Sequence, residues 1–160
     1  MVKFSDMLNE SSSQKIKISI DVHGVIDALP ELFSFLSKAV ISAGGELHIL
    51  TGGAWTVEQE KQLKDFGIVW THVFSAYDHL ISKGAKIANG EVIFPDGTIQ
   101  KKFENGVWDT VKGEYCKEHN ISLHIDDTLA YNNFFTTPFC RLWSHNNKPK
   151  APHKDVRHLD

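Results

Sequence analysis

Residues 15–25 read Lys-Ile-Lys-Ile-Ser-Ile-Asp-Val-His-Gly-Val, and this stretch sets the expected fold. Its three isoleucines alternate with polar residues, a period-2 pattern rich in β-branched side chains that predicts a strand over residues 15–21. The strand ends on Asp21, and His23-Gly24 supplies a turn. In α/β sheets ligands bind outside the carboxyl ends of the strands, so Asp21 is a candidate functional residue.

Strand and helix patterns alternate through the rest of the chain. Further strands are expected at residues 46–50, 69–74, 121–125 and 139–143, and helices at residues 30–42, 57–66, 77–82 and 109–119. Residues 91–103 differ, because two short apolar runs flank Pro95-Asp96-Gly97 and predict a β-hairpin. The alternation favours a three-layer, Rossmann-like α/β fold: a parallel five-stranded sheet with helices on both faces and a small hairpin insertion.

The 160 residues suit one domain, which we expect over residues 15–144. Residues 1–14, with a run of three serines, are expected to be an N-terminal segment. Residues 145–160 form a polar C-terminal tail without periodicity, expected to be loose or draped on the surface.

Composition excludes several classes of protein. A net charge of −3 gives the protein no overall positive electrostatic potential, so general nucleic-acid binding is not expected. No stretch approaches 18 apolar residues, and residues 1–10 lack the apolar core of a secretory signal, so we expect a cytoplasmic protein with no membrane partner. The two cysteines, Cys116 and Cys140, fall in elements predicted to be buried and are expected to be reduced.

Three predicted core strands end on groups suited to phosphoryl chemistry: Asp21, Thr51 and the pair Asp126-Asp127. An aspartate can attack a phosphoryl group and form an aspartyl-phosphate, which divides a difficult hydrolysis into two steps. Mg²⁺ prefers hard oxygen ligands, which Asp21 and Asp127 can supply together with the backbone carbonyl of His23. The Thr51 hydroxyl and the Gly52 N–H can bind phosphate oxygens, and a nearby lysine would keep the acids ionised.

These residues resemble the motifs of the haloacid dehalogenase (HAD) superfamily. Residues 18–26 resemble motif I, a strand followed by Asp-x-Asp-Gly-Thr/Val; residues 48–52 resemble motif II; and residues 123–128 resemble the acidic motif IV. The resemblance covers residues 15–143, with the motifs in order. It implies a sheet ordered 5-4-1-2-3, a Mg²⁺ cofactor and most often phosphatase activity, here a phosphohydrolase acting on a small-molecule or polymer-end phosphate monoester through Asp21.

The superfamily also implies a motif III lysine before motif IV. Lys112, in the first turn of the helix expected at residues 109–119, is favoured for catalysis and phosphate binding, with Lys101 and Lys102 as alternatives. In acid-pair versions of motif IV the second carboxylate usually contacts the metal. Asp127 is therefore assigned as the direct ligand and Asp126 as its support, and the reverse assignment stays open.

His23 departs from the family pattern, because most members carry there a second aspartate that protonates the leaving group and then activates water. An imidazole can itself do acid–base work near neutral pH. The alternatives are a long-lived aspartyl-phosphate or chemistry that needs no acid, and a catalytically impaired protein that binds phosphate, metal or a partner. The metal site is less affected, since any residue supplies a backbone carbonyl.

The segment from Asp21 to Pro30 and the hairpin at residues 91–103 are too small to form a large cap domain. An open site that suits a bulky substrate is therefore expected.

His48 and His124 interrupt apolar strands and are interpreted as hydrogen-bonded sheet residues rather than ligands. The polar positions on these strands suggest a thinly covered sheet face or one paired with another chain, which leaves a homo-oligomer open. A zinc site built on Cys116 and His119 fits no usual spacing and is disfavoured.

Overall fold

The computed structural model describes residues 15–101 and 107–143. The predictions for residues 1–14, for Lys102 and for the tail fall outside the described residues.

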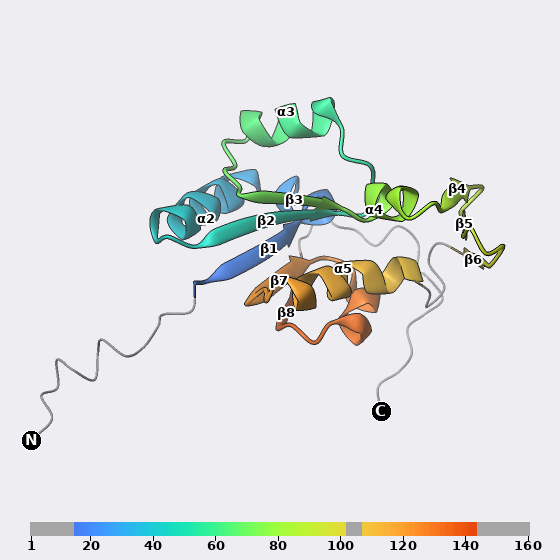
Figure 1. Cartoon of the computed structure of the whole chain (residues 1–160). Helices are drawn as coiled ribbons and strands as arrows, with labels where there is room; N and C mark the ends of the chain where they lie inside the picture. The colour runs from blue at the N-terminus through green and yellow to red at the C-terminus, as the bar shows by residue number, and fades with distance from the viewer. Residues whose placement is uncertain (1–14, 102–106, 144–160) are drawn as a thin grey trace, which may run out of the picture.

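A five-stranded parallel sheet forms the centre of the molecule (Figure 1). Its strands are β1 (Lys17–Asp21), β2 (Glu46–Thr51), β3 (His72–Ser75), β7 (Leu123–Asp126) and β8 (Phe139–Arg141), in the order β3-β2-β1-β7-β8. The α/β fold class is thus confirmed. The order is also the one that the motif resemblance implied, with the Asp21 strand in the middle.

Helices lie on both sides of this sheet. Figure 1 shows α2 (Pro30–Ser42) and α3 (Val57–Asp65) on one side and α5 (Val107–Glu118) on the other, while α4 (Ala76–Ser82) follows β3 directly. Pro30 opens α2 as predicted. The Thr56 side chain caps α3 by accepting a hydrogen bond from the backbone N–H of Gln59 at 3.1 Å.

Two irregular turns follow the strands that carry the acids. The segment η1 (Val22–Ile26) is a wide turn after β1, in which Gly24 has a φ of +82°. A residue with a Cβ would be strained there, so glycine fits this position of the turn. The 3₁₀ helix η2 (Leu129–Phe134) follows β7.

The predicted hairpin forms and gains a strand. β5 (Glu91–Ile93) and β6 (Ile99–Lys101) pair in antiparallel fashion, and β4 (Lys86–Ala88), which the sequence pattern did not indicate, pairs with β5. This small sheet extends beyond α4, away from the central sheet (Figure 1). It is the only insertion between β3 and α5 within the described residues.

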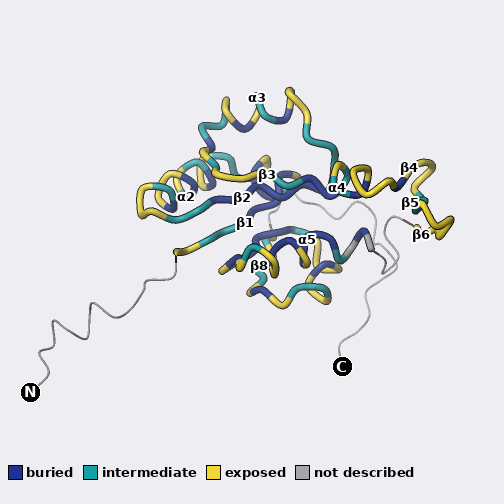
Figure 2. The backbone as a smooth tube through the Cα atoms, viewed as in Figure 1, coloured by how far each residue is buried: buried dark blue, intermediate teal, exposed yellow. Residues whose placement is uncertain are grey.

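The core lies between the sheet and its helices, and Figure 2 shows the central strands as the most continuously buried part of the chain. On the side of α2 and α3 it includes Ile20, Leu47, Ile49 and Phe33. On the side of α5 the polar strand residues Ser19, His48 and His124 are fully buried. The expectation of a thinly covered sheet face is therefore wrong for these positions, because α5 covers them and they bond to one another or to its side chains.

The apolar side chains of α2 do not all face the core. Leu32 and Phe35 are 51% and 74% exposed, because the helix turns Phe33, Ser37 and Val40 toward the sheet instead. The prediction that Cys140 lies in a buried element is wrong. Cys140 is exposed, because it lies on β8, at the edge of the sheet.

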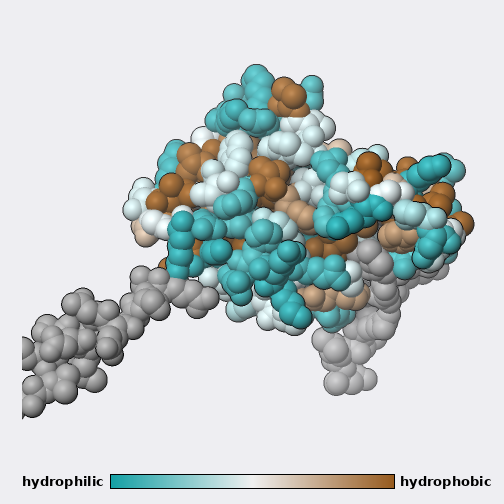
Figure 3. Space-filling model, viewed as in Figure 1, coloured by the Kyte–Doolittle hydropathy of each residue, from teal (hydrophilic) through white to brown (hydrophobic). Residues whose placement is uncertain are grey.

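Figure 3 shows exposed hydrophobic side chains dispersed among hydrophilic ones on the face in view. Among the described helices none has the length and apolar character needed to cross a bilayer.

Candidate active site

The acids predicted at the strand ends come together at one edge of the central sheet. Asp21 is the last residue of β1, Thr51 the last of β2 and Asp126 the last of β7, with Asp127 immediately after it. Since β1 pairs in parallel with both β2 and β7, the three carboxyl ends meet. One carboxylate oxygen from each of Asp21, Asp126 and Asp127 lies within 4.8 Å of the others.

Lys112 joins two of these acids. Its ammonium group donates to Asp21 Oδ1 at 2.6 Å and to Asp126 Oδ2 at 2.7 Å, and the side chain is buried. Helix α5 begins at Val107 rather than at residue 109, so Lys112 lies in its second turn and not in the first as predicted. Of the described alternatives, Lys101 lies exposed at the end of β6 on the small sheet.

The cluster holds more negative than positive charge. Burial raises the pKa of Asp21 more than the Lys112 ammonium lowers it, and the Asp126 carboxylate adds to the rise, so this pKa reaches about 7. Burial acts in the same direction on Asp126, yet Lys112 and His124 hold its pKa well below the usual range. Burial would lower the pKa of Lys112, but the two carboxylates raise it above its ordinary value, so the lysine stays charged.

The two neighbouring acids Asp126 and Asp127 occupy different environments. Asp126 is fully buried, and its Oδ1 accepts from the Thr128 backbone N–H at 2.8 Å while its Oδ2 accepts from Lys112. Asp127 is partly exposed, and its Oδ1 accepts from the Thr128 hydroxyl at 3.1 Å. Both carboxylate oxygens of Asp126 thus accept hydrogen bonds within the protein, and Asp127 is the more accessible carboxylate.

A buried polar chain lies behind Asp126. His124 Nε2 is 3.3 Å from Asp126 Oδ2, and His124 Nδ1 is 2.8 Å from the Ser19 hydroxyl. Burial lowers the pKa of His124, so a neutral imidazole with its proton on Nε2 donates to Asp126. The interpretation of His124 as a hydrogen-bonded sheet residue is confirmed.

The predicted phosphate-binding residues lie beside the acids. Thr51 is fully buried, and its Oγ1 accepts from the Gly53 backbone N–H at 3.2 Å, which leaves the hydroxyl hydrogen able to donate. A Cβ built on Gly52 would lie 3.9 Å from the Trp108 ring, so this indole packs over the glycine. The Tyr131 ring lies 5.1 Å from Lys112 Nζ, a cation–π contact that sequence reasoning missed.

His23 lies outside the buried cluster. Its side chain is 66% exposed, with Nδ1 3.5 Å from Asp27 Oδ2 and Nε2 3.3 Å from the Gln59 side-chain amide nitrogen. Asp27 Oδ1 also accepts from the Gly24 backbone N–H at 2.6 Å. Because the Gln59 amide donates to Nε2, the ring proton belongs on Nδ1, where it faces Asp27.

Asp27 and Gln59 were not predicted as site residues. Asp27 lies four residues after His23, a spacing that could have indicated the pair. Gln59 offered no such signal, because it comes from α3, 36 positions along the chain. Its Oε1 is buried and has no hydrogen-bond partner among the described residues.

Comparison with known proteins adds little to this geometry. No protein-family model matches the chain, and no curated protein matches it. Among solved structures it is similar to a glycosyltransferase from Rickettsia africae ESF-5, with 13% sequence identity and a TM-score of 0.43. That match covers 79% of this chain and 29% of the glycosyltransferase, and at this level of similarity it carries no argument about function.

Proposed function

We propose that this protein is a Mg²⁺-dependent phosphohydrolase of the HAD type, which cleaves a phosphate monoester through an aspartyl-phosphate on Asp21. The observation that carries the proposal is the bridge made by Lys112 between Asp21 and Asp126 at adjacent strand ends. It supports Lys112 as the motif III lysine. The bridge joins three separate segments of the chain, and Thr51 lies at the end of the neighbouring strand β2, so that all four segments follow the order of the family's motifs.

The donor set fits Mg²⁺. Three carboxylates with oxygen atoms within 4.8 Å of one another are hard ligands, and nitrogen or sulfur atoms do not accompany them in this group. Asp21 and Asp127 would hold the ion, with the backbone carbonyl of His23, while Asp126 keeps Lys112 in place. When bound, Mg²⁺ would lower the pKa of Asp21 and neutralise charge on the phosphoryl group.

The residues of this chain then have separate tasks. An Asp21 oxygen attacks phosphorus, the new O–P bond forms, and the bond to the ester oxygen breaks. The Thr51 hydroxyl, the Gly52 N–H and the Lys112 ammonium hold the phosphoryl oxygens. Water attacks the aspartyl-phosphate in the second step, which releases inorganic phosphate and restores the Asp21 carboxylate.

His23 is the proton carrier in this scheme. For the first step the imidazole must be doubly protonated: the proton on Nε2, which then no longer accepts from Gln59, passes to the leaving oxygen. In the second step Nε2 takes a proton from the attacking water. Asp27, close to Nδ1, supports the positive charge that the imidazole carries before the first step and regains in the second. The small size of the β4–β6 insertion favours an open site and a bulky or polymer-end phosphate.

A second candidate function is phosphate or metal binding, or partner interaction, without turnover. It is favoured by one observation: His23 is directed at Asp27 and Gln59 rather than into the Asp21 cluster. An impaired enzyme would keep the charged cluster and lose only the proton carrier.

Phosphate release from a panel of phosphomonoesters with Mg²⁺ tests the proposal. Asp21→Asn should abolish turnover, whereas Asp65→Asn, which changes an exposed acid on α3, should leave it unchanged. Turnover that survives Asp21→Asn, or no turnover of any substrate by the parent, would contradict the phosphohydrolase. Activity that appears only in His23→Asp would instead support the impaired protein.

A further inference from the structure

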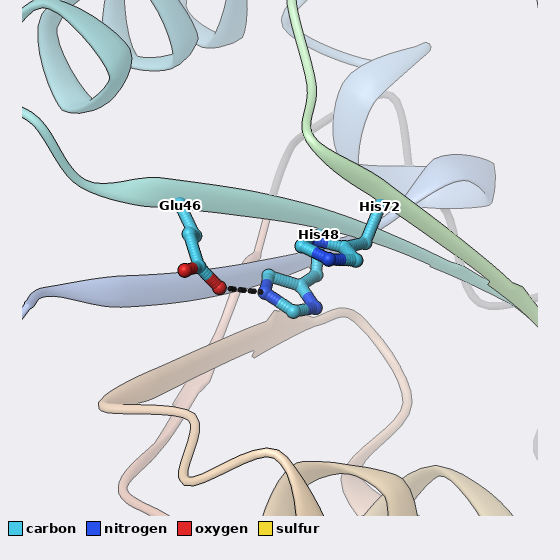
Figure 4. Close-up of side chains that lie close together, drawn as sticks. All are labelled: Glu46, His48 and His72. Atoms are coloured by element: carbon cyan, nitrogen blue, oxygen red, sulfur yellow. Dashed lines mark hydrogen bonds and ion pairs between the residues drawn. The ribbon is translucent and has the colours of Figure 1, made fainter.

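A second cluster of metal-ligating side chains lies at the opposite end of the sheet from Asp21. Glu46 and His48 are the first and third residues of β2, and His72 is the first residue of β3. His48 and His72 are register partners on these parallel strands, and their rings stack with centroids 4.3 Å apart. Figure 4 shows the three side chains gathered in one place.

We propose that Glu46, His48 and His72 form a binding site for Zn²⁺ or a similar transition-metal ion. One ligand atom from each residue lies within 4.8 Å of the other two. Glu46 Oε2 and His48 Nε2 are 3.1 Å apart, near the roughly 3.4 Å that separates two ligands of a tetrahedral zinc ion. Two imidazoles and one carboxylate form a nitrogen-rich set, unlike the all-oxygen set at Asp21.

The hydrogen bonds of His72 leave a nitrogen ready for a metal. The Thr71 hydroxyl donates to the Leu47 carbonyl at 2.8 Å, so its one hydrogen is committed. His72 Nδ1 lies 2.9 Å from the same hydroxyl oxygen and must therefore donate to it. The lone pair of the neutral ring is then on Nε2, and the ring orientation is fixed as in known metal-binding histidines.

His48 has a comparable supporting partner. Its Nδ1 is 2.9 Å from the Tyr115 hydroxyl, which can either donate or accept a hydrogen bond. Without a metal, the Nε2 proton lies toward Glu46 and the phenol donates to Nδ1. Metal binding at Nε2 moves the ring proton to Nδ1, where it donates to the phenol oxygen.

Two lysines and a further histidine near this site affect its affinity for a metal ion. Lys15 Nζ is 3.1 Å from Glu46 Oε1, and Lys17 Nζ is 3.5 Å from Oε2. Only Lys17 competes for the oxygen that faces His48, and its side chain is 27% exposed and able to move aside. The ring of His119, whose centroid is 6.0 Å from that of His48, or a water molecule would supply the fourth ligand.

The site has a position and accessibility that suit a structural or regulatory ion. His72 is exposed while His48 is buried, so an ion can enter from solvent and contact the sheet interior. A bound ion would connect β3, the edge strand, to β2. The inference does not depend on the phosphohydrolase, because these residues lie at the other end of β2 from Thr51.

Calorimetric titration of the full-length chain with Zn²⁺, after saturation with Mg²⁺, tests the site. We expect wild type to bind Zn²⁺ and to unfold at a higher temperature. His72→Gln and Glu46→Gln should each weaken binding by about tenfold or more. His79→Gln, which changes a histidine of α4 outside the cluster, should bind as wild type does.

Two further measurements test whether these residues bind the ion directly. Lys17→Gln should tighten Zn²⁺ binding, because it removes the ammonium group that competes for Glu46 Oε2. Co²⁺ in place of Zn²⁺ should give visible absorption bands that His72→Gln loses. No Zn²⁺ binding by wild type, or equal binding by His72→Gln, would overturn the proposal. His72→Gln and Glu46→Gln alter partly exposed side chains, so neither variant is expected to fail to fold.

Discussion

The ammonium group of Lys112 donates to Asp21 Oδ1 across 2.6 Å, although the two residues are 91 positions apart in the chain. Both side chains are buried, so this contact is made away from water. A buried charge that loses its partner is costly, whereas an exposed one is not. The pair therefore links the stability of the fold to the chemistry proposed for Asp21.

Lys112→Met should destabilise the protein and abolish phosphate release. The substitution leaves Asp21 and Asp126 without their cation, which costs about 3–5 kcal/mol for a broken buried ion pair. Urea unfolding at pH 7 measures the change. Lys117→Met, at an exposed position on the same helix, should shift the unfolding free energy by no more than about 0.5 kcal/mol. Equal stability of the two variants would argue against the bridge.

Asp21→Asn should stabilise the metal-free protein at pH 8 relative to wild type. The pKa of Asp21 is raised from 3.8 to about 7, so between these values the folded state holds a proton that the unfolded state has released. Asp21 therefore lowers stability as pH rises through this window, and its full cost is present above pH 7. The expected gain in unfolding free energy is about 1–3 kcal/mol. It is smaller than the free energy that corresponds to the whole pKa shift, because Lys112 loses a partner in Asp21→Asn.

Urea unfolding in a chelator from pH 5 to pH 8 measures this difference. Burial lowers the pKa of His48 and of His124, and these groups make stability rise with pH up to about 6.5, the unfolded value. They are common to both proteins, so the difference between wild type and Asp21→Asn isolates the aspartate. A difference that does not grow with pH would contradict the raised pKa.

Asp127→Asn and Asp126→Asn should have different effects. Asp127 is half-buried and proposed as a metal ligand, so its substitution should weaken Mg²⁺ binding and change the metal-free stability little. Asp126 pairs with Lys112, and its substitution should destabilise the metal-free protein by about 3 kcal/mol. Thermal unfolding with and without Mg²⁺ separates these outcomes. The reverse pattern would assign Asp126 as the direct ligand.

Gln59→Leu should reduce kcat and leave the fold intact. The Gln59 amide contacts His23 Nε2 at 3.3 Å, while its own Oε1 is buried without a described partner, so an apolar replacement should change stability by less than about 1 kcal/mol. Gln62→Leu, at an exposed position on the same helix, is the control.

A double-mutant cycle distinguishes a positioning role from a structural one. If Gln59 acts through His23, Gln59→Leu should have no further effect on kcat in a His23→Ala background. Additive losses in the double variant would show that Gln59 acts elsewhere.

The sequence by itself determined the sheet and the place of its acids. Alternation of isoleucines predicted the strand that ends on Asp21, and similar patterns predicted the strands that end on Thr51 and Asp126. These predictions succeed because side-chain periodicity is a local property, and because parallel strands bring their carboxyl ends to one edge whatever the details of packing.

Only the tertiary structure decided which side chains from distant segments meet. It placed Lys112 against Asp21, left Phe35 of α2 exposed, placed Gln59 against His23, and set His48 beside His72. Each of these contacts depends on the rotation of a helix or the register of a strand. Such quantities are fixed by close packing of the whole core, which residue spacing along the chain does not encode.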